Sequence, residues 1–223
     1  MTKTLSKKIQ GEETRATLIK TGARLFAQQG YSGVSMRPLA AEAGVNLATV
    51  SYHFGGKAGL YEAIIQEIIN VRDELFPSSE EVEEHMLKAG SDKDAQGLAV
   101  DWFVAKLTHN LLAGEDYTWP AVIISRELAH PSDLYPKMEK EFFDPTFHAL
   151  RTLVQGTQPA DITKEELIIT SQCVIGIIIK FLEGRVILHK RLEWDSYHAN
   201  IDTLTTILQK RIRGLLGLPM ETV

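Results

Sequence analysis

The segment from Met36 to Phe54 constrains this chain most strongly, because three of its positions restrict one another. Small Ala40 falls where two short helices would cross, Gly44 falls in the turn between them, and Val50 falls where the second helix would pack back onto the first. A close helix crossing needs a small side chain, and a sharp turn needs the conformational freedom of glycine. The spacing therefore predicts a helix-turn-helix motif.

The rest of the chain also follows the helical period. Between about residues 12 and 29, Leu18, Leu25 and Phe26 recur on one face, and Gly30 ends the pattern. Ten helices are predicted, near residues 12–29, 36–43, 47–54, 57–76, 80–89, 94–113, 118–129, 133–155, 164–190 and 196–216. We therefore predict an all-α fold of nine or ten helices, with Ser35 and Asn46 as N-caps within the motif.

The second helix of the motif is predicted to bury Leu47, Val50 and Phe54. This leaves an outer face of Ala48, Thr49, Tyr52 and His53, with Ser51 near its edge. Such a face suits the major groove of DNA, where Thr49 can meet base edges while Tyr52, His53 and Lys57 reach phosphates. The alternative is an ordinary three-helix unit in which Tyr52 and His53 only face solvent.

Charge is divided unevenly along the chain. Residues 1–60 hold eight Lys and Arg against three Asp and Glu, a net charge of +5, so the remainder carries −10 in a chain whose total is −5. Phosphate contacts require local rather than global positive charge. The N-terminal segment is therefore predicted to face nucleic acid, and the remainder to form an acidic body.

The stretch from Thr14 to Tyr61, above all RLFAQQGYSGVSMRPLAAEAGVNLATVSYHFGGKAGLYEAII, resembles the DNA-binding domain of the TetR family. It shows the family's order of a first helix, a Gly-Tyr pair, a capped helix-turn-helix, Tyr-His-Phe and Lys. A second stretch, ISRELAHPSDLYPKMEKEFFDPTFHAL, followed by a long apolar helix and RLEWD, is similar to a TetR subgroup with a shared type of effector domain.

The resemblance implies a homodimeric bacterial repressor. Its three-helix DNA-binding head would be followed by a larger helical domain for ligand binding and dimerisation. The expected divisions are a disordered arm (1–11), a helix-turn-helix domain (12–60) and an effector-binding and dimerisation domain (61–223). The implied partners are a palindromic operator in double-stranded DNA and a small-molecule inducer that releases the repressor from it.

The family's motif assigns expected roles to individual residues. Ser35, Tyr52, His53 and Lys57 are expected to contact phosphates, and Asn46, Ala48 and Thr49 to lie nearest the bases. Arg37 and Ser51 complete this expected surface. Pro38 departs from the family pattern, which has a polar or acidic residue there in many members, and we expect it to alter only the start of a helix.

Large apolar side chains that follow the predicted DNA-binding domain could line an effector cavity or form plain core. The candidates are Trp102, Phe103, Trp119, Ile123, Phe142 and Phe143. Arg126 and Glu127 join them, because charged groups inside an apolar helix need a partner when buried. The sequence leaves open whether that partner is a ligand or whether the two residues form a structural ion pair.

The last two predicted helices carry more apolar surface than one neighbour can cover. With their symmetry mates they would form a four-helix dimer interface built from Ile168, Ile175, Ile179, Leu182, Leu204, Leu208 and Ile212. The alternative is a bundle within one chain. Dimerisation is favoured because one helix-turn-helix of this size buries too little surface on DNA for specific affinity.

Other functional classes lack a signal in the sequence. There is no catalytic motif, phosphate-binding glycine loop, or metal-ligand spacing around His130 and His148, so no enzyme, cofactor or metal is predicted. The single Cys173, predicted to be buried, and the lack of a signal peptide or membrane span favour a cytoplasmic protein. The remaining rivals are a helical carrier or enzyme and a nonspecific architectural DNA-binding protein. The effector, operator and regulated genes are not encoded in these patterns.

Overall fold

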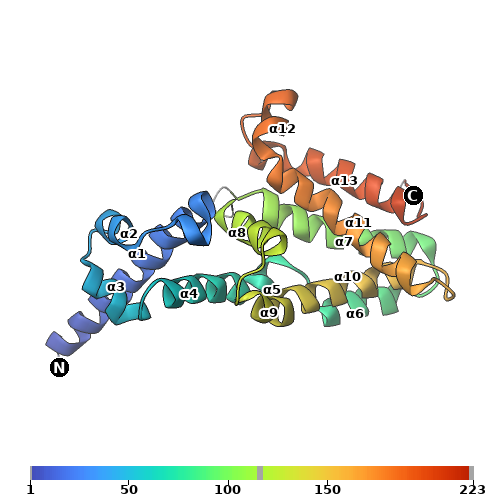
Figure 1. Cartoon of the computed structure of the whole chain (residues 1–223). Helices are drawn as coiled ribbons and strands as arrows, with labels where there is room; N and C mark the ends of the chain where they lie inside the picture. Colours follow the sequence, from blue (N-terminus) through green and yellow to red (C-terminus); the bar gives the residue numbers. More distant parts are fainter. Residues whose placement is uncertain (1, 115–117, 221–223) are drawn as a thin grey trace. The chain divides into compact units, whose positions relative to one another are not determined.

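A computed structural model describes residues 2–114 and 118–220, and all regular structure in these residues is helical (Figure 1). The chain divides into two compact units. We call residues 1–70 and 119–136 the head and residues 71–118 and 137–223 the body. The expected boundary at residue 60 therefore differs from the division in the structure, because the whole fourth helix and a distant segment belong to the head.

The head contains five helices. They are α1 (Thr2–Gly33), α2 (Met36–Glu42), α3 (Leu47–Phe54), α4 (Lys57–Asn70) and α8 (Thr118–Ala129). Helix α1 packs against α4, and the contact is close because a Cβ at Gly22 would lie 3.1 Å from side-chain atoms of Leu60 and Ile64. Leu18, Phe26 and Leu60 are almost fully buried and form the core of this unit.

The expected disordered arm is helical where it is described. Met1 lies outside the described residues, and α1 runs without interruption from Thr2 through the arm to Gly30. Residues 2–10 contain no proline or glycine that would interrupt the helix. The next residue, Gly11, has space for a side chain, because no atom lies within 4 Å of the position that a Cβ would take. Gly30 interrupts the regular helix as predicted, with φ 73° and ψ 168°, although helical turns resume as far as Gly33.

The body is built around α7 (Lys93–Leu112). Helices α6 (Ser79–Ala89), α10 (Asp144–Thr157), α11 (Lys164–Glu183) and α13 (Ile201–Leu215) pack against it, as do the four residues of α5 (Arg72–Leu75). Val100, Val104, Leu107 and Leu112 are completely buried. Because α7 is covered on several sides, it buries residues around much of its circumference rather than a single stripe.

Three predicted helices are each divided in the structure. The expected helix 57–76 is interrupted at Val71, between α4 and α5, and the expected helix 164–190 bends by 75° at Gly184 between α11 and α12 (Arg185–Leu192). The expected helix 133–155 consists of α9 (Tyr135–Met138), a π-helical segment (Glu139–Phe143) and α10. These interruptions raise the count to thirteen α-helices among the described residues, with a 3₁₀ turn (His198–Asn200) before α13.

No single helix among the described residues combines the length and hydropathy that a membrane crossing requires; α11 and α12 would do so only jointly, across the 75° bend between them.

Candidate nucleic-acid interface

The turn between α2 and α3 has the geometry that its sequence predicts. Gly44 adopts φ 70°, a conformation that residues with a side chain rarely take. The amide of Val45 then donates to the carbonyl of Ala40 over 2.9 Å. Ala40 and Val50 are 2% and 0% exposed, so the two short helices meet through the positions expected from their spacing.

Asn46 fixes the start of α3. Its Oδ1 accepts hydrogen bonds from the backbone amide of Thr49 over 2.8 Å and from the Thr49 hydroxyl over 3.0 Å. The predicted cap at Asn46 is therefore present. Ser35 is the N-cap residue of α2, as predicted, and has an extended conformation, but its side chain makes no capping hydrogen bond. The side chain of Ser35 is exposed.

The outer face of α3 is open to solvent. Tyr52 is 85% exposed, Ala48 and Ser51 are exposed, and Thr49 and His53 are half-buried. Leu47 departs from its predicted burial, since it is 40% exposed at the first position of the helix, where α2 does not cover it. The face available to a ligand is consequently wider and more apolar than expected.

Lys57 begins α4 beside the end of α3. Its Nζ lies 4.8 Å from the centre of the Tyr31 ring and donates to the carbonyl of Ser32 over 3.4 Å. Gly59 permits this arrangement, because a Cβ there would collide with the backbone carbonyl of Phe54. The sequence analysis did not identify Gly59, whose requirement comes from the close approach of two chain segments.

Within the helix-turn-helix, Arg37 is exposed at the start of α2. Pro38 lies in the first turn of α2, where its missing amide removes no intrahelical bond, and α2 begins at Met36 as predicted. Arg15 lies 5.5 Å from the centre of the Phe54 ring. The exposed residues of α2 and α3 thus lie within the part of the sequence that carries the net charge of +5.

The eight candidate effector residues are shared equally between the two units. Trp119, Ile123, Arg126 and Glu127 lie in the head, and Trp102, Phe103, Phe142 and Phe143 lie in the body. Within the body, Trp102 stacks on His85 at 3.8 Å between ring centres, whereas Phe142 packs edge-on against Phe76 at 5.6 Å.

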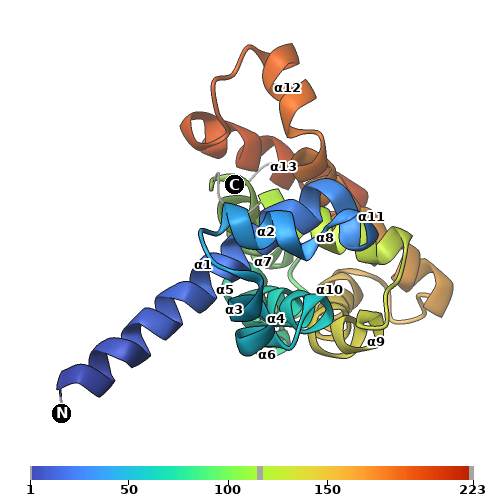
Figure 2. The same ribbon diagram turned by 60° about the vertical axis from the view of Figure 1, so that its left-hand side comes forward.

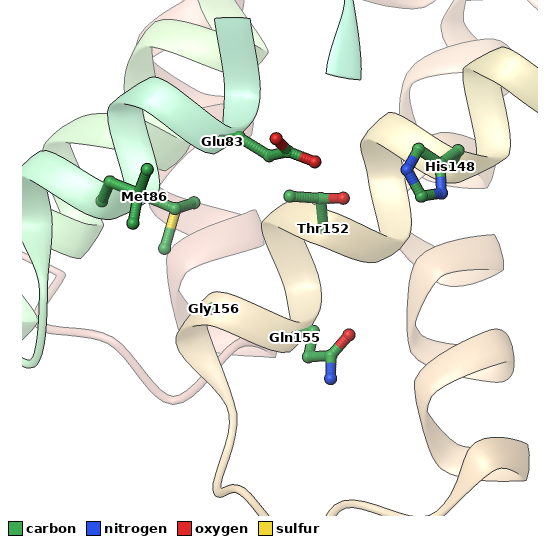
Figure 3. A pocket seen from close by; sticks show the side chains of 7 residues that line it. Glu83, Met86, His148, Thr152, Gln155 and Gly156 are labelled. Atoms are coloured by element: carbon green, nitrogen blue, oxygen red, sulfur yellow. The ribbon is translucent and has the colours of Figure 1, made fainter. Parts of the chain in front are cut away.

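A groove of about 530 Å³ opens between α6 and α10 of the body (Figure 3). It is lined by Glu83, Met86, Leu87, His148, Thr152, Gln155 and Gly156. None of the eight candidate effector residues contributes to it. At Gly156 the two helices are in close contact, because a Cβ there would lie 2.6 Å from the Met86 side chain.

Arg126 and Glu127 make hydrogen bonds that lead away from one another. Arg126 donates to the carbonyls of Ala27 and Gln28 in α1 over 3.1 and 3.3 Å. Glu127 is 2% exposed, and its Oε1 accepts a hydrogen bond from the Tyr61 hydroxyl over 2.7 Å. Burial, followed by this bond, raises the pKa of Tyr61, so Tyr61 remains a donor.

Most of the predicted dimer-interface residues are used inside one chain. Five of them are at most 8% exposed within the protomer: Ile175, Leu182, Leu204, Leu208 and Ile212. Their assignment to a dimer interface was therefore wrong, because side chains buried in one chain cannot contact a second. Leu208 and its neighbours lie on α13, which packs along α7. Ile179 is half-buried and Ile168 is 45% exposed.

Other apolar side chains of α11 and α13 face outward. Ile169, Ile207 and Leu215 are 62%, 47% and 43% exposed. Cys173 is also exposed, and its predicted burial is wrong because it lies on α11 away from the buried side that includes Val174. Each helix therefore has one face packed in the body and a second face with exposed apolar groups.

Among the described residues, no group of three or more His, Cys, Asp or Glu side chains could hold a metal ion.

Comparison with known proteins identifies two family models. Residues 18–64 match the model of bacterial regulatory proteins of the tetR family, and residues 99–217 match the C-terminal domain of the HTH-type transcriptional dual regulator CecR. The chain is 28% identical over 193 residues to that regulator from Shigella flexneri, covering 85% of this chain and 84% of the relative. Over 54 residues it is 44% identical to the probable HTH-type transcriptional regulator YttP of Bacillus subtilis strain 168, covering 24% and 26% of the two chains.

Solved structures with similar folds are also transcriptional regulators. The hemolysin II transcriptional regulator HlyIIR aligns with a TM-score of 0.59 and 18% identity, covering 90% of this chain and 97% of that chain. AibR, solved with isovaleryl coenzyme A and operator DNA, aligns with a TM-score of 0.57 and 16% identity over 76% of this chain and 86% of that chain. These likenesses establish the fold.

Proposed function

Because the chain belongs to the TetR family of bacterial transcriptional regulators, we propose that it binds a palindromic operator as a homodimer and is released by a small-molecule effector. It would act in the bacterial cytoplasm as a repressor. The observation that carries the proposal is the outer face of α3, on which Tyr52 is 85% exposed at the end of a capped helix. The helix packs on the head through buried Val50, which leaves that face free to enter a major groove.

We assign base contacts to Ala48 and Thr49 and phosphate contacts to Ser35, Arg37, Tyr52, His53 and Lys57. The free hydroxyl of Ser35 and the exposed side chain of Arg37 support the assignment. Asn46 has a different main role in this proposal, because its Oδ1 is already engaged by Thr49. Ser51 lies at the rim of the surface, where its hydroxyl donates to the Leu47 carbonyl over 3.4 Å.

The proposed dimer uses the outward faces of α11 and α13. Their exposed apolar groups, Ile169, Ile207 and Leu215, replace the five buried residues that the sequence analysis assigned to an interface, while Ile168 and Ile179 remain candidates. We expect Ile207→Asp to convert dimers into monomers, because it would place a charge in an apolar contact. Sedimentation of Ile207→Asp beside Leu87→Asp, an apolar position of α6 that is 82% exposed and lies outside the proposed interface, tests this assignment.

Effector binding is proposed for the body, which contains most of the segment, residues 99–217, that matches the CecR C-terminal domain. That relative is named a dual regulator, so both repression and activation need to be measured for this chain. A ligand can shift DNA binding only through its different affinity for the DNA-binding and released states. If a broad ligand screen left operator affinity unchanged, the inducer part of the proposal would be wrong.

The test of operator recognition begins with selection of genomic fragments bound by the purified protein. Affinity for the best site is then measured for the wild type, Thr49→Ala, Tyr52→Ala and the control Leu87→Ala, whose side chain is 82% exposed in the body. We expect a palindromic site that the two α3 variants bind about tenfold more weakly, while the control binds as the wild type does. Equal binding by all four proteins would refute the assignment of α3.

Two salt concentrations and a scrambled duplex distinguish the proposal from a nonspecific architectural protein. Nonspecific binding rests on counterion release and would be equally strong for operator and scrambled DNA. A specific regulator keeps its preference for the operator as salt weakens both.

A further inference from the structure

Helix α8 contacts α1 and α4, the two helices of the head that carry Tyr31 and Lys57. We propose that Arg126 and Glu127 are positioning residues for operator binding, which hold the end of α1 and the start of α4 so that Lys57 is placed for a phosphate. This inference rests on the proposed function and gives the two charged residues a role inside the head instead of at an effector. Figure 2 shows α1 and α4 beside each other in the head, and the contacts with α8 lie near the end of α1.

Arg126 supports α1 where its helical conformation is interrupted. Gly30 leaves the helical conformation with φ 73° and ψ 168°, which interrupts the helix directly after the turn that contains the carbonyls of Ala27 and Gln28. Arg126 supplies donors to both of these carbonyls. Its Nη1 also lies 3.2 Å from the point where a Cβ on Gly30 would be, so the guanidinium group occupies the space beside this glycine.

Glu127 supports α4 through Tyr61. One carboxylate oxygen accepts from the Tyr61 hydroxyl over 2.7 Å. The other accepts from the amide and the hydroxyl of Ser132 over 3.1 and 2.9 Å. With both oxygens engaged and the side chain 2% exposed, Glu127 is held in one orientation and in turn orients the Tyr61 ring.

Aromatic contacts extend this support to Lys57. The Tyr61 ring packs against Phe26 at 4.9 Å and against Tyr31 at 5.0 Å between ring centres. Tyr31 follows Gly30 directly, and its ring lies 4.8 Å from the Lys57 ammonium. Arg126 and Glu127 therefore act on the same residue, Tyr31, one through the backbone before it and the other through Tyr61. A cation held against an aromatic face has fewer available positions, so its placement depends on that ring.

The experiment compares Tyr61→Phe, Glu127→Gln and Lys57→Met by titration of the selected operator at several salt concentrations. Tyr61→Phe removes only the hydroxyl and keeps the ring. Glu127→Gln keeps the shape but has only one acceptor oxygen, so it cannot accept from the Tyr61 hydroxyl and from the Ser132 amide as the two carboxylate oxygens do. Tyr197→Phe is the matched control, because Tyr197 is a buried tyrosine of the body whose hydroxyl donates to the Phe181 carbonyl over 3.1 Å.

We expect Tyr61→Phe and Glu127→Gln to bind the operator about tenfold more weakly and to reduce the salt slope by about one, as Lys57→Met does. The double variant Tyr61→Phe with Lys57→Met should bind no more weakly than Lys57→Met alone, because both changes act on the same phosphate contact. Tyr197→Phe should keep the wild-type affinity and slope.

A loss of affinity at the wild-type salt slope, or a further loss in the double variant, would overturn the inference, as would an equal loss in Tyr197→Phe. Circular dichroism establishes that each variant is folded, and Arg126→Lys, which keeps the charge but cannot reach two carbonyls as the guanidinium does, replaces any variant that is not. If the wild type binds an operator and the variants keep its slope, only this inference fails. If the wild type binds no DNA, the proposed function fails and the inference fails with it.

Discussion

The helix-turn-helix and the body differ in how far apart in the sequence their determining contacts lie. In the helix-turn-helix, Asn46 caps α3 by accepting from the amide of Thr49, three residues along the chain, and Gly44 turns the chain between adjacent helices. In the body, Arg213 pairs with Asp101 over 2.5 Å, and the hydroxyls of Thr108 and Thr205 meet over 2.8 Å. A surface built from local contacts can be predicted from a short segment, whereas one built from distant contacts requires the folded chain.

Among variants that test this comparison, Leu208→Ala in the body is expected to change the free energy of unfolding most. Leu208 is 2% exposed on α13, so truncating it should leave a cavity and lower the free energy of unfolding of the body by about 3 kcal/mol. Hydrogen exchange of the body's amides provides the measurement. Lys210→Ala, at an exposed position of the same helix, should change it by less than about 0.5 kcal/mol. Similar values for the two variants would contradict a core at α13.

The next effect is expected in the head, at Gly59→Ala. The new Cβ would collide with the carbonyl of Phe54, so α3 and α4 must separate, at about 2 kcal/mol of head stability. Operator affinity should fall more than tenfold, because α3 and Lys57 would move apart. Gly11→Ala is the matched control: nothing lies within 4 Å of its position in α1, and it should stabilise the helix slightly. Normal operator binding by Gly59→Ala would show that this close approach is dispensable.

A smaller effect is expected for Asn46→Ala, which removes the cap of α3 and should lower head stability by about 1 kcal/mol. Asn46→Ser restores a capping oxygen and should recover most of that stability. Operator titration then distinguishes two roles of Asn46. Recovery of affinity in Asn46→Ser indicates a cap, whereas equal loss in both variants indicates a direct base contact.

The smallest effect is expected for Lys106→Met, which should change how the stability of the body depends on pH. The hydrogen bonds from Lys106, followed by the Ser78 amide, hold the pKa of Glu81 below its ordinary value of 4.5. Because the folded pKa is lowered, this stabilisation is present above the unfolded pKa and is lost as pH falls through the folded pKa. When the pH falls below about 4.5, Lys106→Met should therefore lose less stability than the wild type does. The difference should be less than about 1 kcal/mol, because the pair is partly exposed. Identical acid denaturation curves for Lys106→Met and the wild type would show that the pair contributes nothing.

The sequence predicted the all-α fold and most helix positions, because periodicity and glycine or proline breaks are local signals. It predicted the buried Ala40 and Val50 and the cap at Asn46 for the same reason. The predicted burial of Leu47 was wrong, since the one helical turn at the start of α3 is not enough to decide which side its partner covers.

The candidate sites in the second half of the chain were harder to predict. An apolar stripe has the same pattern whether it meets its own chain or another, so Leu204 and Leu208 were assigned to a dimer interface although α7 covers them. The burial of Cys173 was predicted from its apolar neighbours and was wrong, because one step of a helix turns a side chain by about 100° and separates Cys173 from buried Val174. The roles of Arg126 and Glu127 depended on partners about 65 to 100 positions away.

The discontinuity of the head has a consequence for chimeric regulators. A DNA-binding module cut after α4 would leave the Tyr61 hydroxyl without its carboxylate acceptor and the Ala27 carbonyl without the Arg126 donor. An exchange of DNA specificity between members of this family would then join one protein's α1 and α4 to another's α8. For this chain, the transferable module consists of two separate stretches, residues 1–70 and 119–136, and the second must be exchanged with the first or matched to it.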